Sequence, residues 1–214
     1  MRQTSTCPRK DDKNKHSKRL TISRQKKFPV STKSKVFPSK DKCLCYIKSH
    51  PSLYLFSEDK TATGNKRFIA STREYIYNAL QDPPSWLYEN IEKDQPVKLH
   101  LDIDLKSKNI PKGVNEMAYF KQVLTVSLAL VEEELLKYKA NNPKTLLLTA
   151  HREEKLSAHV IYPYLHFQTI KHLKQFMDKI ESPVISKRIL DTSIYRIGCF
   201  RTIFSSKYGT DSRL

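Results

Sequence analysis

The sequence has few cysteines and no long apolar run. Its four cysteines, Cys7, Cys43, Cys45 and Cys199, form neither a disulfide framework nor the paired CxxC spacing of a zinc site. No apolar stretch approaches the roughly 18 residues of a membrane helix, and none follows the basic start as in a secretory signal. These absences predict an intracellular protein with no membrane partner. Cys43 and Cys45, with His50 nearby, leave open either a small metal site or ordinary strand cysteines.

The positive charge is concentrated at the beginning of the chain. Lysine and arginine number 39 against 22 acidic residues, a net charge of +17, and residues 1–42 hold 14 basic and 3 acidic residues, a net of +11. This stretch is rich in Lys, Ser, Thr and Pro and has no apolar periodicity. We therefore expect residues 1–42 to be a disordered basic tail. Its basic clusters fit either a solvated tether or a segment that binds nucleic-acid phosphates or directs nuclear import.

Residues 43–214 have the hydrophobic patterning of a folded α+β domain. In an N-terminal αβ module, residues 43–95, we expect irregular strand over 42–57, a hairpin of 53–56 with 67–70, and a helix from the capping box at 71–74 to about residue 80. In a second module, residues 96–214, the expected strands are 97–105, 145–150, 157–162 and an extended segment at 184–195. The expected helices are 115–138 and 169–180.

The second module follows the order strand, helix, strand, strand, helix, strand. This βαββαβ order is typical of an RNA-recognition-motif-like antiparallel sheet, in which two helices cover one face. The other face stays open and can carry site residues.

Two aspartates on one strand are the most informative feature. Because side chains alternate along a strand, one face is expected to hold Val97, Leu99, Leu101, Ile103 and Leu105, and the other Lys98, His100, Asp102 and Asp104. The first face can be buried core. The second places two carboxylates about 7 Å apart, close enough to share one hard cation or a pair. Paired acids of this kind suit metal-assisted chemistry on phosphates.

Two further groups of polar residues complement this pair. Lys155, Ser157 and His159 share one face of the strand at 157–162 and offer an ammonium, a hydroxyl and an imidazole to polyphosphate oxygens. Asp191 ends a later apolar stretch and is either a turn residue or a third metal ligand. Arg201 and Lys207 follow it and supply positive charge for a triphosphate.

In their order and spacing these groups resemble the signature of the archaeo-eukaryotic primase superfamily, the primase-polymerases. That family carries an acidic pair on a strand, here Asp102 and Asp104, a Ser-x-His strand, here 157–159, and a later apolar-Asp, here 190–191. Phe200-Arg201 with Ser205-Ser206-Lys207 resembles the tail found in its eukaryotic and viral branches. The resemblance covers about residues 53–208 and is nearest to the N-terminal primase domain of asfarvirus-type helicase-primases of large DNA viruses.

The resemblance implies an archaeo-eukaryotic primase fold and a nucleotidyltransferase. Asp102, Asp104 and Asp191 would bind two Mg²⁺ or Mn²⁺ ions, and the incoming nucleoside triphosphate would be held by Lys155, Ser157, His159, Arg201 and Lys207. The template would be single-stranded DNA and the product a primer for DNA replication. The full-length protein would carry a C-terminal helicase region that is missing from this chain. A viral source implies replication sites in the host cytoplasm, and the basic tail would allow nuclear import.

Three other interpretations of the residues stay open. A non-catalytic nucleic-acid-binding module of a replication helicase would use the same sheet and tail, with salt-sensitive and metal-independent binding. A nucleotide-sugar transferase would use the Asp-x-Asp pair but leaves Ser157 and His159 unexplained. A structural role would make the acids ordinary surface charges on a strand.

Overall fold

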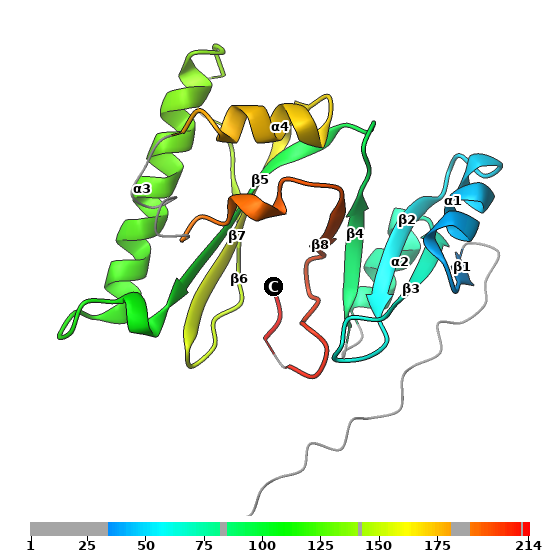
Figure 1. Ribbon diagram of the computed structural model, residues 1–214, viewed down its shortest axis with the longest axis horizontal. Coiled ribbons are helices and arrows are strands. Elements are labelled where there is room, and N and C mark those ends of the chain that lie inside the picture. The colour runs from blue at the N-terminus through cyan, green and yellow to red at the C-terminus, as the bar shows by residue number, and fades with distance from the viewer. Residues whose placement is uncertain (1–33, 82–84, 141–142, 181–188, 211) are drawn as a thin grey trace, which may run out of the picture.

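A computed structural model describes residues 34–81, 85–140, 143–180, 189–210 and 212–214. Within these ranges the chain forms two antiparallel sheets, which stand side by side in Figure 1, each with its own helices. The fold is therefore α+β, as expected. No helix of the described ranges is long and apolar enough to cross a membrane. Most of the expected tail, residues 1–33, lies outside the described residues.

The first sheet has five strands in the order β1-β3-β2-β4-β8. Its strands are β1 (Ser34–Phe37), β2 (Tyr54–Asp59), β3 (Lys66–Ser71), β4 (Leu87–Ile91) and β8 (Gly198–Arg201). The predicted hairpin corresponds to β2 and β3, joined through Gly64, which adopts a φ of 82° that favours glycine. Two helices accompany this sheet, α1 (Lys40–Lys48) and α2 (Arg73–Leu80).

The beginning of this sheet differs from the sequence prediction. Residues 34–42, expected in the disordered tail, contain β1 and the first turn of α1, and residues 42–48, expected as irregular strand, are helical. The helix forms because the Ser39 side chain accepts a hydrogen bond from the Lys42 N–H, and Asp41 adds negative charge to the first turn. Cys43 packs beneath the helix in a small core with Leu53, so it is a helical rather than a strand cysteine.

β8 crosses the module boundary expected near residue 95. It comes from the C-terminal part of the chain, yet it pairs with β4 of the N-terminal part, with Tyr88 opposite Arg201 and Ile91 opposite Gly198. The two modules are therefore not consecutive stretches of sequence. Residues 198–201 complete the first sheet and bring the C-terminal segment against the second sheet.

The second sheet has the order β5-β7-β6, from β5 (Val97–Lys106), β6 (Leu146–Thr149) and β7 (Lys155–Phe167). The strand expected at 157–162 corresponds to β7, which continues past Pro163 to Phe167. Its register with β5 shifts between Lys98 and Leu99, so that residues 163–165 bulge out of the ladder. A proline has no N–H to give to a ladder, and the bulge accommodates it.

A short bridge adds to the free edge of β5. Ile103 pairs with Leu190, and two main-chain hydrogen bonds of 2.8 Å flank the pair, from Asp104 N–H to Ile189 O and from Asp191 N–H to Asp102 O. The segments thus lie in the order Leu190, β5, β7, β6. Of the extended segment expected at 184–195, residues 184–188 lie outside the described residues, and Thr192–Ile194 form a 3₁₀ turn, η2.

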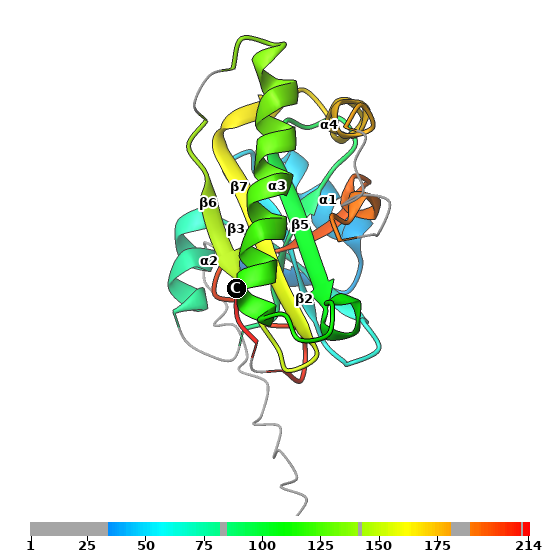
Figure 2. The ribbon, with the colours of Figure 1, turned by 90° about the vertical axis from the view of Figure 1, so that its left-hand side faces the viewer.

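The main core lies between the second sheet and its two helices, α3 (Glu116–Leu136) and α4 (Ile170–Met177). Figure 2 shows α3 crossing in front of β5 and β7. On β5, Leu99, Leu101, Ile103 and Leu105 are fully buried, which confirms the alternation predicted for this strand. Each such side chain contributes about 2 kcal/mol through burial. This core therefore holds β5 rigidly, with its opposite face directed at the first sheet.

Candidate functional site

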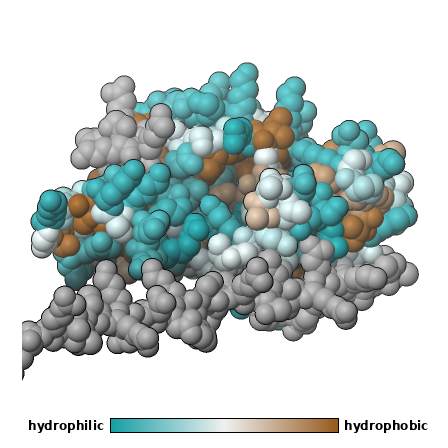
Figure 3. All heavy atoms as spheres, turned by 60° about the horizontal axis from the view of Figure 1, so that its bottom comes forward, coloured by the Kyte–Doolittle hydropathy of each residue, from teal (hydrophilic) through white to brown (hydrophobic). Residues whose placement is uncertain are grey.

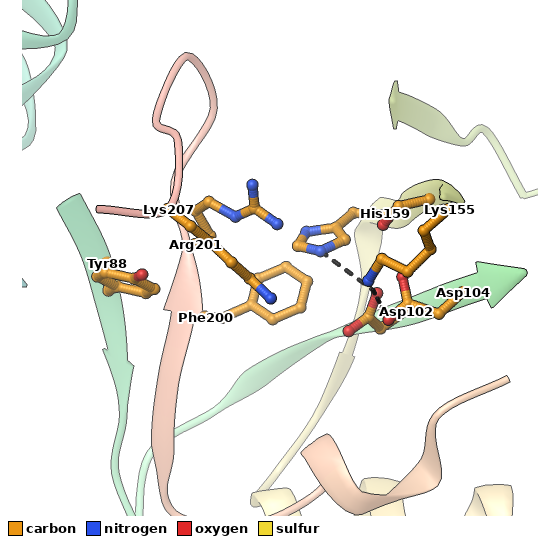
Figure 4. Close-up of a pocket in the computed structure, with 9 residues that line it drawn as sticks. Tyr88, Asp102, Asp104, Lys155, His159, Phe200, Arg201 and Lys207 are labelled. Atoms are coloured by element: carbon orange, nitrogen blue, oxygen red, sulfur yellow. Dashed lines mark hydrogen bonds and ion pairs between the residues drawn. The ribbon is translucent and has the colours of Figure 1, made fainter. Parts of the chain in front are cut away.

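One pocket lies between the two sheets and gathers seven of the eight predicted site residues. It is lined by Tyr88, Asp102, Asp104, Lys155, Ser157, His159, Phe200, Arg201 and Lys207. The carboxylates come from β5, while Arg201 and Lys207 come from β8 and the turn after it (Figure 4). Asp191 is the predicted residue that does not line the pocket. Tyr88 and Phe200 also line the pocket, and neither was among the residues predicted to bind the metal ions or the nucleotide.

The acidic pair is held against β7 by the strand register. Asp102 lies opposite His159 and Asp104 opposite Ser157, so all four side chains share the open face of the sheet. The Lys155 Nζ lies 2.6 Å from Asp104 Oδ2 and forms an ion pair with it. The His159 Nε2 lies 3.4 Å from Asp102 Oδ1, a contact that is not a well-aligned hydrogen bond.

Several buried polar atoms at the pocket have no hydrogen-bond partner among the described residues. They are Asp102 Oδ1, Asp104 Oδ1, His159 Nδ1 and the Nε2 of His100, which lies behind the pocket. Buried polar atoms are nearly always satisfied, and those that are not point to a function or to a bound group. Carboxylate oxygens are the ligands that hard divalent cations prefer. The two unpaired carboxylate oxygens therefore fit a divalent cation.

Asp191 lies beside Asp102 but its carboxylate serves another purpose. Its main-chain N–H donates to Asp102 O, and its Oδ1 accepts the Ser193 N–H at 2.8 Å, which caps the η2 turn. No three His, Cys, Asp or Glu side chains within the described ranges are grouped so as to hold a metal ion. A third carboxylate ligand would require the Asp191 side chain to turn from Ser193 towards Asp102.

The alternative metal site near Cys43 receives no support from the geometry. Cys43 is buried beneath α1 and Cys45, two residues further along the helix, is exposed. Residues two apart on a helix do not face each other. The His50 ring stacks on Tyr46 and its Nδ1 lies 2.9 Å from Tyr46 O.

Burial and neighbouring groups shift the pKa values of the two aspartates in opposite directions. Burial raises the pKa of Asp102 to about 6, and repulsion from Asp104 and Asp191 adds to the effect. Burial also opposes ionisation of Asp104, but the hydrogen bonds from Lys155 and Ser157 outweigh it, and the pKa of Asp104 is lowered. At neutral pH both are ionised, but Lys155 pairs directly with Asp104, whereas Lys155 and Arg201 offset the raised pKa of Asp102 only in part.

The histidine and the cations of the pocket are perturbed in a complementary way. Burial, followed by the charge of Arg201, lowers the pKa of His159 to about 3, so its imidazole is neutral. Burial lowers the pKa of Lys207, and the neighbouring charges of Lys155, Arg201 and Arg152 lower it further. Crowded cations repel one another until an anion joins them. The β8 side of the pocket is therefore prepared for a polyanionic group.

Phe200 joins the two sheets at the floor of the pocket. Its ring centroid lies 4.5 Å from that of His100 and 4.6 Å from that of His159. His100, predicted on the open face, is indeed on that face but is buried under Phe200 and Tyr195. A strand prediction identifies the face but not what covers it, and nothing in the local sequence indicated that β8 would fold over β5.

Comparison with known proteins gives no independent assignment. The chain matches no protein-family model, and no curated protein matches it.

Proposed function

We propose that the chain is a DNA-dependent primase-polymerase domain of the archaeo-eukaryotic primase superfamily, which makes primers for DNA replication by nucleotidyl transfer. One observation carries the proposal. Two buried carboxylate oxygens, on Asp102 and Asp104, receive no hydrogen bond from any described residue and face the cations Arg201 and Lys207 across a single pocket. A divalent cation and a triphosphate are the pair of ligands that this division of charge suits best.

The arrangement of the second sheet also supports the proposal. Its order is β5-β7-β6 with an isolated bridge at Leu190 beside β5, and α3 follows β5 while α4 follows β7, which is compatible with a βαββαβ sheet of the RNA-recognition-motif type. The residues that resemble the superfamily signature lie on the central strands β5 and β7 and on the bridging segment at residue 190. In this interpretation the first sheet contributes the second wall of the site through β8.

Eight of the nine residues that line the pocket then have a role, and Tyr88 is the exception. Asp102 and Asp104 would hold the cations, and Asp191 would be a third ligand only if its side chain turned from Ser193. Bound divalent ions supply the chemistry of lowering the pKa of a 3′-hydroxyl and neutralising the triphosphate charge. Arg201 grips phosphate oxygens through its planar fork and Lys207 acts as a point charge.

The remaining residues orient the nucleotide. Ser157 and the neutral His159 would donate hydrogen bonds to phosphate oxygens, and Lys155, the partner of Asp104, would offer its ammonium to the same phosphates. Phe200 fixes the His159 ring by packing against it. Catalysis by this chain is then mainly positioning and electrostatic stabilisation.

The net charge of the chain fits a polyanionic partner. Hydrophilic residues cover much of the described surface on the face shown in Figure 3, with hydrophobic patches between them. The excess of basic over acidic residues favours single-stranded DNA as the template. The basic residues before Ser34 would add to this attraction or direct nuclear import, and a helicase region of the full-length viral protein, acting in the host cytoplasm, would supply further template contacts.

The test is dinucleotide synthesis on single-stranded DNA with Mn²⁺ and nucleoside triphosphates. Asp102→Ala and Asp104→Ala should each reduce the rate by at least about 100-fold, the scale on which loss of a metal ligand acts. Asp178→Ala is the matched control, because this exposed aspartate at the end of α4 is ion-paired with Lys174 and lies outside the pocket. Wild-type rates in both pocket variants would exclude the proposal.

A second candidate, the non-catalytic nucleic-acid-binding module, is favoured by one observation. Lys155 already neutralises Asp104, so the pocket has an internal cation without any metal. This candidate predicts binding of single-stranded DNA that falls steeply with salt and is unaffected by Mn²⁺ or by Asp102→Ala. Three results together would establish this candidate in place of the enzyme: the protein binds single-stranded DNA, synthesises no dinucleotide, and shows no binding of Mn²⁺.

A further inference from the structure

The segment that carries the two phosphate-facing cations contains a strained residue. Phe204 lies between Arg201 and Lys207 and has a φ of 63°, in the left-handed region that a bulky side chain rarely adopts. Such a conformation persists only where the surroundings impose it, and it is found preferentially at functional sites. The contacts around residues 202–206 show what imposes it.

Contacts of both the ring and the backbone hold Phe204 in this conformation. The ring packs against the small core under α2 that contains Phe56, Ile69 and Leu87. Its N–H donates to Leu214 O at 2.9 Å, and the Leu214 N–H donates back to Ser205 O at 3.1 Å. The turn is thereby clamped between the first sheet and the last residues of the chain.

Ser205 lies at the centre of a closed hydrogen-bond network. Its side chain is fully buried, and its Oγ lies 3.2 Å from the Leu87 N–H donor, 2.8 Å from Thr202 Oγ1 and 3.3 Å from Ser85 Oγ. The Thr202 hydroxyl donates its one proton to Leu87 O, at 3.0 Å. Ser205 must therefore donate to Thr202 and accept from both Leu87 and Ser85.

This assignment uses the whole capacity of the Ser205 hydroxyl, one donor and two acceptors. It ties the turn to the start of β4, and the Ser206 N–H adds a further bond to Ser85 O at 2.9 Å. Arg201 precedes the network and Lys207 follows it. The separation of the two cations is therefore set by Ser205 and Phe204, neither of which lines the pocket.

We infer that Ser205 and Phe204 are positioning residues that hold Lys207 and Arg201 at the spacing required for a polyphosphate. This inference rests on the proposed function, because it assigns the task of these two residues to the same pocket. A hydroxyl that only stabilised the fold would not change the affinity for an anion once the protein is folded. A positioning hydroxyl changes that affinity through Lys207 and Arg201.

The experiment measures binding of inorganic tripolyphosphate by calorimetry. Lys207→Ala should weaken binding strongly, and Ser205→Ala should weaken it about tenfold, within the range that displacing a positioned group costs. Thr202→Val keeps the shape of the side chain but removes one leg of the network, and should weaken binding in the same direction. This variant keeps the test valid should Ser205→Ala fail to fold.

Ser127→Ala is the matched control for loss of a buried serine hydroxyl. Ser127 is fully buried in α3, and its Oγ donates to Val123 O at 2.8 Å, outside the pocket. It should lower the unfolding midpoint while leaving tripolyphosphate affinity within about twofold, as expected for a distant site. In dinucleotide synthesis, Ser205→Ala should raise KM for the nucleoside triphosphate more than it lowers kcat.

A double-mutant cycle distinguishes a positioning role of Ser205 from a purely structural one. If Ser205 acts through Lys207, Ser205→Ala should weaken tripolyphosphate binding much less in the Lys207→Ala protein than in the wild type. Full additivity, or unchanged affinity in Ser205→Ala and Thr202→Val while Lys207→Ala weakens binding, would overturn the positioning role and leave the proposed function intact. Unchanged affinity in Lys207→Ala would instead refute the phosphate pocket itself.

Discussion

Substituting Asp102 by asparagine should make the protein more stable at pH 8. Burial, together with Asp104 and Asp191, raises the pKa of Asp102 from 3.8 to about 6, so ionising it costs the folded state free energy. A pKa difference of about 2, at ~1.4 kcal/mol per pKa unit, sets an upper limit of about 3 kcal/mol on this cost. Asparagine has nearly the same shape and carries no charge. We therefore expect a gain in unfolding free energy of about 1–3 kcal/mol.

The sign of the pH dependence follows from the raised pKa. The folded state binds the Asp102 proton more tightly than the unfolded chain, so the associated stability is fully present below pH 3.8 and is lost as the pH rises through about 6. The advantage of Asp102→Asn should consequently be large at pH 8 and nearly absent at pH 4. Urea unfolding at the two pH values, in a buffer with a metal chelator, measures both quantities.

Asp104→Asn is the matched comparison, because it lies two residues away on the same strand and has a lowered pKa. Its ionised form is stabilised by Lys155 and Ser157, so this substitution should destabilise the protein at pH 8. Adding Mn²⁺ at pH 8 should stabilise the wild type and not Asp102→Asn. An Asp102→Asn protein that is less stable than wild type at pH 8, or equally shifted at both pH values, would refute the reasoning.

Two further predictions concern neighbours of the acidic pair. Lys155→Met removes the ammonium that pairs with Asp104 but keeps the apolar stem, so the pKa of Asp104 should rise; a carboxyl-carbon NMR titration that does not move would contradict this. Phe200→Ala removes the ring packed between His100 and His159 and should lower the unfolding free energy by about 2–3 kcal/mol, less than for a fully buried phenylalanine. A loss below about 0.5 kcal/mol in urea unfolding would show that the ring does not join the sheets.

The part of the site built on neighbouring strands could be predicted from the sequence. The two-residue period of β5 and β7 determines which side chains share a face, and the buried leucines at 99, 101 and 105 follow the predicted pattern. Asp102, Asp104, Ser157 and His159 therefore lie together as expected. This succeeded because periodicity is local and because antiparallel neighbours in a sheet are the commonest arrangement.

Features that depend on distant contacts were missed. β8 is four residues long and pairs with β4 across more than 100 positions, and no local pattern specifies such a pairing. The same applies to Phe200, whose task depends on where β8 docks. By contrast, the error at α1 was avoidable in principle, because Ser39 and Asp41 form a recognisable helix start. The capping of η2 by Asp191 likewise has a local signal, an aspartate followed by Thr-Ser.

The return of the chain from the second sheet to the first has a consequence for the order of assembly. During synthesis β1 to β4 leave the ribosome long before residues 198–201, so β4 stays an exposed edge of the first sheet until those four residues have emerged. The pocket acquires Arg201 and Lys207 only when that edge is filled. Nascent chains halted before Gly198 should consequently contain both acids yet lack the two triphosphate contacts of Arg201 and Lys207.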